Sequence, residues 1–256
     1  MNQLNFKVFG EGQPLIILHG LFGSLDNWIT LARKFAEHYK VYIVDQRNHG
    51  LSFHAEEFNY ELMAQDLADL MSYEKIESAH LIGHSMGGKT AMNFAVSYPQ
   101  KVDQLVIADI GPKYYPVHHM QIIKALYSIR LEELTARKDA DEKMSELIKN
   151  VGIRQFLLKN LQRDGDVFRW KMNLDAIAKQ IEEVGKALNQ NAQYVKETLF
   201  IKGANSDYIQ DGDMILINSI FPKARLETIE GAGHWLHAEK PKEFYDVVAK
   251  FLSNER

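Results

Sequence analysis

One serine of this chain lies in a sequence context that can make its hydroxyl group a nucleophile. Residues 83–87 read Gly-His-Ser-Met-Gly, the pattern G-x-S-x-G with Ser85 at its centre. A short, largely apolar segment precedes them, and residues 88–96 carry small and apolar side chains at helical spacing. Strand, sharp turn and helix form the setting of a nucleophile elbow, whose flanking glycines make room for a strained turn. The helix N-terminus would also favour negative charge that forms beside Ser85.

A serine hydroxyl needs a general base within hydrogen-bond reach, and the base needs an acid that orients it. The best base is His234, which lies in a glycine-rich loop after the last expected strand. Two acids fit the chain order of serine, acid and histidine. Asp109 ends one apolar strand segment, and Asp207 follows the next. Residue type does not choose between them, because only their positions in the fold can do so.

The remaining histidines give no sign of a metal site. His237 lies three residues after His234, but no H-E-x-x-H pattern or matching carboxylate spacing accompanies the pair. The sequence therefore predicts no metal site. Five further histidines are expected to be solvated or structural: His38, His54, His80, His118 and His119.

Acyl-group chemistry also needs backbone N–H groups that bind the oxyanion of the transition state. The first candidate is Met86, the residue after the nucleophile. The second is Leu21, in the loop that follows the strand expected at residues 15–18. That loop reads His-Gly-Leu-Phe-Gly-Ser over residues 19–24, and its glycines let the backbone approach a substrate closely.

The elements that must position these residues alternate along the chain. Strands are expected at residues 4–9, 15–18, 41–44, 80–83, 105–109, 199–202 and 225–229, and helices at 28–38, 60–73, 86–98, 208–219 and 241–252. Several strands are near-continuous apolar runs, which suits strands buried on both faces of a parallel sheet. The alternation predicts a doubly wound α/β domain with its site beyond the carboxyl ends of the strands.

A long interruption separates two of these strands. Residues 112–195 lack the strand pattern. Their pattern of apolar residues predicts helices at 120–134, 141–151, 153–162 and 174–188. An insertion at this place would lie over the carboxyl edge of the sheet as a helical cap, or lid, above an apolar pocket. We therefore expect a core of residues 1–111 and 196–256 and a cap subdomain of residues 112–195. The alternative is that these helices pack on a face of the sheet.

The composition excludes several classes of protein. The chain has 256 residues, a formal net charge of −4 and a pI of about 6.2, so no basic face for nucleic acid or membranes is evident. The absence of cysteine excludes disulfides and thiol nucleophiles. No signal-peptide layout and no apolar run of roughly 20 residues is present. We expect a cytoplasmic protein whose partner is a small molecule, with no nucleic acid and no membrane span.

These motifs resemble those of the α/β-hydrolase superfamily over nearly the whole chain. Residues 19–27 resemble the oxyanion segment, 45–52 the D-x-R-x-H-G-x-S loop, 83–89 the elbow and 231–241 the histidine loop. Within the superfamily the chain is most similar to the YbfF-type bacterial esterases, on residues 47–50, Lys89 and residues 203–206. The resemblance implies the α/β-hydrolase fold, a mostly parallel sheet flanked by helices with an inserted helical cap, and a small carboxylesterase without a cofactor.

The resemblance also bears on the choice of acid. Most members of the superfamily place an aspartate three residues after the glycine that ends the penultimate strand. Here that position is Ser206, and Asp207 comes one residue late. YbfF-type esterases take the acid from the end of the preceding strand instead. The resemblance thus implies Asp109, with Asp207 as the alternative.

Other residues are expected to support the site. Arg47, Asn48 and His49 would brace the loop beneath it, and Lys89 would be a solvated surface lysine. The candidates for lining the substrate pocket are Phe22, His84, Tyr114, Tyr115, Phe156, Trp170 and Trp235.

The leading hypothesis is hydrolysis of an ester or thioester. Ser85 would form an acyl-enzyme, His234 would move the protons, and the N–H groups of Leu21 and Met86 would bind the oxyanion. Carbon–carbon bond hydrolysis, amide cleavage and cofactor-free haloperoxidase chemistry are alternatives on the same residues, because a fold does not fix a reaction. A non-enzymatic ligand receptor is the hypothesis of a different class, and it would bind without turnover.

Overall fold

The computed structural model describes residues 3–253, and its largest element is a seven-stranded sheet with the order β1-β3-β2-β4-β5-β8-β9. β1 is antiparallel to β3, and the other neighbouring pairs are parallel. The predicted strands are all present, with shifts at their ends. Their bounds are β1 (Phe6–Phe9), β2 (Pro14–Leu18), β3 (Lys40–Val44), β4 (Ala79–His84), β5 (Val102–Ala108), β8 (Thr198–Gly203) and β9 (Ala224–Ile229). The mostly parallel α/β sheet predicted from the sequence is confirmed.

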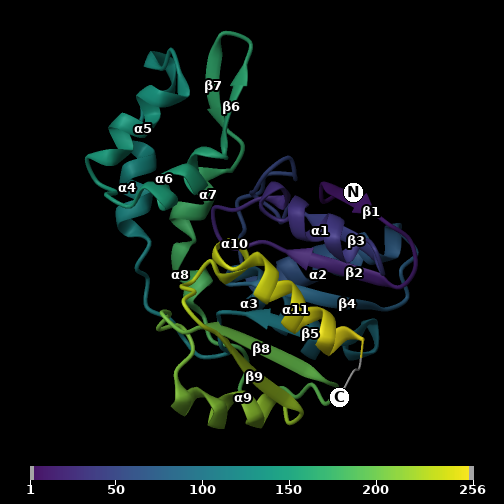
Figure 1. Cartoon of the computed structure of the whole chain (residues 1–256). Coiled ribbons are helices and arrows are strands. Elements are labelled where there is room, and N and C mark those ends of the chain that lie inside the picture. Colours follow the sequence, from purple (N-terminus) through teal and green to yellow (C-terminus); the bar gives the residue numbers. More distant parts are fainter. Residues whose placement is uncertain (1–2, 254–256) are drawn as a thin grey trace.

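Helices cover both faces of this sheet (Figure 1). One face carries α1 (Ile29–Phe35) and α11 (Pro241–Leu252), and the other carries α2 (Tyr60–Tyr73), α3 (Met86–Ser97) and α9 (Met214–Ile220). Three shorter elements join them: the 3₁₀ turns η1 (Leu25–Asn27) and η2 (Pro99–Lys101), and helix α10 (Leu236–Glu239). The sheet is thus the middle of three layers.

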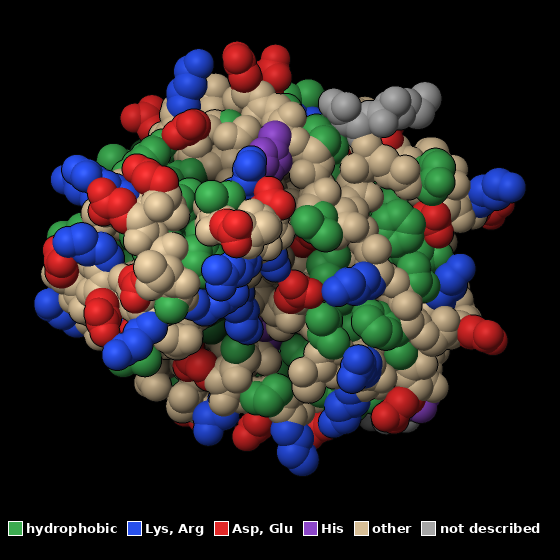
Figure 2. Space-filling view, turned by 90° about the horizontal axis from the view of Figure 1, so that it is seen from above, with side chains coloured by type: hydrophobic (Ala, Val, Ile, Leu, Met, Phe, Trp, Pro, Cys, Tyr) green, Lys and Arg blue, Asp and Glu red, His purple; other side chains and the backbone are tan. Residues whose placement is uncertain are grey.

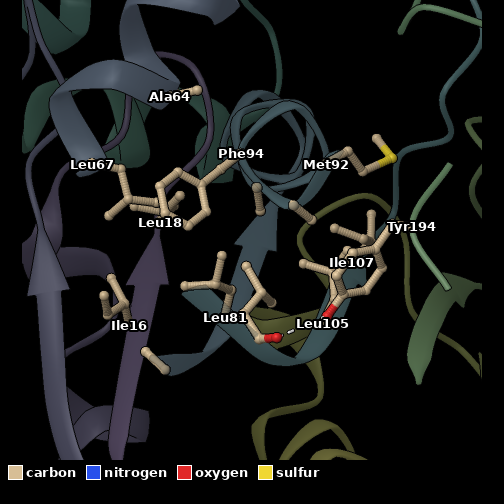
Figure 3. Close-up of a cluster of buried hydrophobic side chains, with 14 of the residues drawn as sticks. Ile16, Leu18, Ala64, Leu67, Leu81, Met92, Phe94, Leu105, Ile107 and Tyr194 are labelled. Atoms are coloured by element: carbon tan, nitrogen blue, oxygen red, sulfur yellow. Dashed lines mark hydrogen bonds between the residues drawn. The ribbon is translucent and has the colours of Figure 1, made fainter. Parts of the chain in front are cut away.

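Alternation along the strands fills both layers of the core. Leu15 and Ile17 of β2 pack in the cluster that contains α1 and α11, whereas Ile16 and Leu18 pack in the cluster that contains α2 and α3. Figure 3 shows the second cluster, with Leu18 close to Phe94 of α3. Because both faces of each central strand are buried, the strands need apolar residues at every position.

Two of the helices predicted for the core begin or end several residues away from their expected bounds. The helix expected at residues 28–38 is shorter, because η1 precedes α1 and the helix proper ends at Phe35. The helix expected from Tyr208 begins only at Met214, after a further 3₁₀ turn, η4 (Asp211–Asp213). Tyr208 instead lies in a loop, where its ring stacks on the ring of His234 at a centroid distance of 3.9 Å. That contact holds the residue out of a helix.

The turn between β4 and α3 is crowded on both sides of Ser85. A Cβ atom on Gly87 would lie 2.4 Å from the carbonyl oxygen of Leu18, and one on Gly83 would lie 2.3 Å from the carbonyl oxygen of Gly87. Only glycine fits at either position. The helix can therefore begin directly at the end of the strand, with Ser85 at a φ of 52°.

Residues 112–195, called the cap from here on, leave the core after β5 and return to it before β8. In Figure 1 this segment extends away from the sheet. Hydrogen bonds fasten it to core loops: Asn160 Nδ2 donates to the Phe22 carbonyl over 2.6 Å, and the Asn173 N–H donates to the Asn48 carbonyl over 2.9 Å. Its helical elements are α4 (Met120–Tyr127), η3 (Leu131–Glu133), α5 (Arg137–Ser145), α6 (Val151–Leu158), α7 (Leu174–Lys179) and α8 (Ile181–Gly185).

The expectation that helices alone make up the cap is wrong at one place. β6 (Leu161–Asp164) and β7 (Val167–Trp170) form an antiparallel hairpin. Its two-residue loop begins with Gly165 at a φ of 62°, which suits a tight hairpin turn. Each strand has only four residues, and β6 buries only Leu161 fully, so neither strand has the apolar run that identifies the core strands.

We predict that Gly87→Ala destabilises the fold, because its methyl group would overlap the Leu18 carbonyl. Forcing an extra carbon into a packed site typically costs about 1–3 kcal/mol, which lowers the melting temperature of a chain of this size by several degrees. Thermal unfolding followed by circular dichroism measures the shift. Gly212→Ala is the matched control, because no heavy atom lies within 4 Å of its added carbon. Equal melting temperatures for the two variants would contradict the steric account of the elbow.

Candidate active site

Ser85 stands at the junction of the central strand β4 and helix α3. Its N–H donates to the Ala108 carbonyl of β5 over 3.0 Å, and its carbonyl accepts from the Lys89 N–H over 3.0 Å. The backbone of Ser85 is thus held by the sheet on one side and by the first turn of the helix on the other. This fixes the direction of its side chain.

His234 reaches Ser85 from the loop after β9. Its Nε2 atom lies 3.0 Å from Ser85 Oγ, and its Nδ1 atom lies 2.7 Å from Asp109 Oδ2. A carboxylate accepts hydrogen bonds, so Nδ1 carries the proton and Nε2 is free to accept the serine proton. Glu239 shapes the loop, because its carboxylate accepts from the N–H groups of Gly233 and Trp235.

Asp109 is fully buried at the end of β5, the strand next to β4. Its backbone has a φ of 52°, so it turns out of the strand at once. Oδ1 accepts from the Gly203 N–H over 3.1 Å, and Oδ2 accepts from the Ser206 hydroxyl as well as from His234. Asp207 is exposed, and its neighbour Ser206 contacts the carboxylate instead. The structure thus brings Asp109, rather than Asp207, to His234.

Two rings enclose the imidazole of His234. Tyr208 stacks on it with an interplanar angle of 14°. His84 Nε2 donates to the His234 carbonyl over 2.8 Å, which fixes the backbone of the histidine loop. Tyr208 was not among the predicted site residues, because its segment was expected to be helical. Its place directly after the candidate acid Asp207 was the one local signal.

The loop after β2 brings Leu21 close to Ser85. A Cβ atom on Gly20 would lie 3.3 Å from Ser85 Cβ, so the chain passes next to the nucleophile there. Phe22 follows at a φ of 58°, and its N–H donates to His49 Nε2 over 3.2 Å. Met86 begins α3, so its N–H belongs to the first helical turn, which lacks intrahelical acceptors. The backbone that leads into Leu21 and the first turn of α3 therefore both lie beside Ser85.

The loop of residues 45–52 packs against the loop that follows β2 and supports it. His49 supports Phe22, and Arg47 donates to both carboxylate oxygens of Asp66 over 2.6 and 2.8 Å. Asp45 accepts from the N–H groups of Leu25 and Leu51. The loop thus ties the oxyanion segment to α2.

A cavity of about 210 Å³ opens beside Ser85 and His234 under the cap. Of the predicted lining residues, Phe22, His84, Phe156 and Trp235 do line it. Tyr114 and Trp170 do not: Tyr114 is exposed, and Trp170 packs against the hydrophobic cluster of the cap. Tyr115 lines a second, smaller cavity. His118 and His119, expected to be solvated or structural, line both cavities.

Lys89 is not the solvated surface lysine that the sequence suggested. Its side chain is buried, and Nζ donates to the carbonyls of Lys113 and Lys186. These residues belong to the two connections between the core and the cap. Burial, together with the nearby charge of Lys113, lowers the pKa of Lys89 to about 7.

Several buried histidines surround the site. Burial lowers the pKa of His19 to about 4 and the pKa values of His49 and His237 to about 3. It also lowers the pKa of His84 well below its usual value. His19 and His49 each accept a backbone N–H at Nε2, which only a neutral imidazole can do. Within residues 3–253, no group of three or more ligating side chains is placed to hold a metal ion.

The family model described as the alpha/beta hydrolase fold matches residues 13–144. The mouse (Mus musculus) protein named sn-1-specific diacylglycerol lipase ABHD11 is 40% identical over 247 residues, covering 93% of this chain and 80% of the relative. The chain belongs to the α/β-hydrolase fold family. Another member, esterase YbfF of Escherichia coli (strain K12), is 36% identical and covers 95% of this chain and 94% of its own.

A solved structure agrees with this assignment. The structure titled "Marine microorganism esterase" superposes with a TM-score of 0.96 at 46% identity, covering 98% of this chain and all of the other. The resemblance to YbfF-type esterases is confirmed, and this α/β-hydrolase is an enzyme of the esterase and lipase group. Between residues 3 and 253, no helix has the length and apolar character needed to cross a bilayer. Figure 2 shows that the cap side carries both acidic and basic side chains.

We predict that the fold loses stability as the pH falls below about 6.5. The buried histidines stay neutral in the folded chain, whereas in the unfolded chain they bind protons near pH 6.5. Their contribution is complete above pH 6.5 and declines toward their folded-state pKa values, by up to about 1.4 kcal/mol per pH unit for each group. Urea unfolding between pH 7.5 and 5 measures the slope.

His237→Phe should reduce that slope by the contribution of about one proton taken up on unfolding. Phenylalanine keeps a ring stacked on Trp28 but does not titrate. His237 Nδ1 also has no hydrogen-bond partner, so the ring replacement strands no polar group. His38→Gln is the matched control, since His38 is exposed. An unchanged slope in His237→Phe would contradict the neutral state assigned to this histidine.

Proposed function

We propose that this protein is a serine hydrolase that cleaves carboxylic esters of small molecules through an acyl-enzyme on Ser85. The observation that carries the proposal is the hydrogen-bonded series of Ser85, His234 and Asp109 beside a largely apolar cavity. Relatives named as an esterase and as a diacylglycerol lipase support an ester as the substrate. Thioesters fall within the same chemistry.

In the first half of the reaction, Ser85 Oγ attacks the ester carbonyl carbon while its proton passes to His234 Nε2. The carbonyl oxygen becomes an oxyanion, held by the N–H groups of Leu21 and Met86. Collapse of this intermediate breaks the bond to the alcohol oxygen, which takes the proton from His234 Nε2. The alcohol leaves, and the acyl group stays on Ser85.

In the second half, water takes the place of the alcohol. It gives a proton to His234 Nε2 as its oxygen attacks the acyl carbon. The intermediate then expels Ser85 Oγ, which recovers the proton from His234, and the carboxylic acid is released. Asp109 stabilises the protonated imidazole at both stages, since its buried carboxylate lies 2.7 Å from Nδ1.

The cap serves this chemistry by limiting water. His119, Ile153 and Phe156 of the cap roof the cavity above the serine. Exclusion of water strengthens the hydrogen bonds to the oxyanion, because the local dielectric constant is lower. We propose that residues 112–195 act as this lid.

Ser85→Ala should lower kcat for 4-nitrophenyl acetate by at least about 10⁴-fold, because the acyl-enzyme cannot form. Circular dichroism checks that the variant is folded. The matched control is Ser219→Ala, an exposed serine on α9, which should keep normal turnover and normal labelling by a fluorophosphonate. Activity of Ser85→Ala within tenfold of the parent would refute the nucleophile.

The two aspartates give a second test. Asp109→Asn should lower kcat by about 10³- to 10⁴-fold, because the amide favours the wrong tautomer of His234. Asp207→Asn should stay within about twofold of the parent, since Asp207 is exposed. Steady-state kinetics on the same ester compares them. The reverse ranking would move the acid to Asp207.

A further inference from the structure

Two cavities meet at Ser85, and they differ in size and lining. The smaller has a volume of about 20 Å³, and the larger has a volume of about 210 Å³. Ser85, His118, His119 and Tyr208 border both. A substrate whose carbonyl carbon is bound to Ser85 Oγ can therefore extend one substituent into each cavity.

The proton donor distinguishes the two cavities. His234 lines only the larger cavity, whereas Met86 and Lys89 line only the smaller one. The leaving alcohol oxygen must lie within hydrogen-bond reach of His234 Nε2 to receive its proton. The alcohol portion therefore belongs in the larger cavity, and the acyl portion is left with the smaller one.

The size of the smaller cavity limits the acyl group. A cavity needs about 10–15 Å³ to hold one water molecule, so 20 Å³ has room for little more than a methyl group beyond the carbonyl carbon. Its walls come from the core, at Tyr60 and Met86, and from the cap, at Val117 and Val184. Three hydrogen bonds hold these walls together: Tyr60 OH donates to the Val184 carbonyl over 2.7 Å, and Lys89 Nζ donates to one carbonyl in each cap connection.

The alcohol side has much more room. The larger cavity is mostly apolar, and at 210 Å³ it exceeds the roughly 150 Å³ that accommodates benzene in an engineered cavity. Beyond it lies a third cavity of about 530 Å³ between α6 and α10. Phe156 and Trp235 line both cavities, with their ring centroids 5.8 Å apart. A long alcohol chain can continue past these two rings.

We propose that this enzyme is selective for esters of short acids, acetyl to propionyl, with larger apolar alcohols. This inference rests on the proposed ester hydrolysis at Ser85 and adds the orientation of the substrate. Selection arises because the cavity on the acyl side is small and the cavity on the alcohol side is large.

A pair of isomeric esters tests the orientation. Octyl acetate and ethyl octanoate have the same atoms and release primary alcohols of similar acidity, but they place the long chain on opposite sides of the carbonyl. We expect kcat/KM to be at least about 100-fold higher for octyl acetate, because even one surplus methylene in a tight pocket costs about tenfold or more. Titration of the released acid measures both rates.

Substitutions in the wall of the small cavity should shift this preference. Val184→Ala removes two carbons next to the acyl group, so the ratio of kcat/KM for ethyl butyrate over ethyl acetate should rise about tenfold. Val117→Ala on the other cap connection provides a second variant if the first does not fold. Ile215→Ala is the control, because this exposed residue lies on α9, outside both cavities, and the ratio should not change.

The outcomes separate this inference from the proposed function. Equal rates for the two isomers, or faster cleavage of ethyl octanoate, would overturn the orientation and leave ester hydrolysis intact. A ratio unchanged in both wall variants would overturn the assignment of the acyl pocket. Cleavage of neither isomer, together with no turnover of 4-nitrophenyl acetate, would overturn the proposed function and this inference with it.

Discussion

The close approach of helix α3 to the end of strand β2 is the constraint on which the site depends. The carbonyls of Leu18 and His19 lie so near Gly87 that no side chain fits between them. The helix therefore starts directly at the end of β4, and Ser85 takes a φ of 52° at the turn. Parallel pairing of β4 with β5 then determines where Asp109 lies relative to Ser85. His84 of β4 is in register with Ala108 of β5. The residues that follow them, Ser85 and Asp109, therefore emerge at the same edge of the sheet.

This dependence explains why so much of the site could be predicted from the sequence. The elbow, the histidine loop and the strand segments are local patterns, and the carboxyl ends of parallel strands must share one edge. The choice of acid was harder, because Asp109 and Asp207 both follow strands that end there. Two features separate them in the structure. Asp109 turns out of its strand at a positive φ, and its carboxylate accepts from Ser206 and His234, whereas Asp207 is exposed.

The residues that the sequence did not predict owe their positions to distant partners. Lys89 is buried because two carbonyls, from residues 24 and 97 positions further along the chain, accept its hydrogen bonds. Tyr208 leaves the expected helix because it stacks on His234. The β6–β7 hairpin is built from two four-residue strands and gains its burial from Leu161 and Phe168, which pack in the cap cluster. The periodicity of apolar residues indicates which face of a helix or strand is buried. It carries no information about contacts with residues that are distant in the sequence.

The cap, the segment that was hardest to predict, is therefore also the one that helps to shape the two cavities beside Ser85. The core supplies the residues that we propose as nucleophile, base, acid and oxyanion donors, whereas the cap supplies one wall of each cavity at Ser85. A lysine from the elbow helix joins the two at both ends of the cap. Its ammonium group faces two carbonyls at positions where the cap leaves the core and returns to it. Because Lys89 is buried and donates to both carbonyls, the core holds the two connections of the cap on the side where the smaller cavity lies.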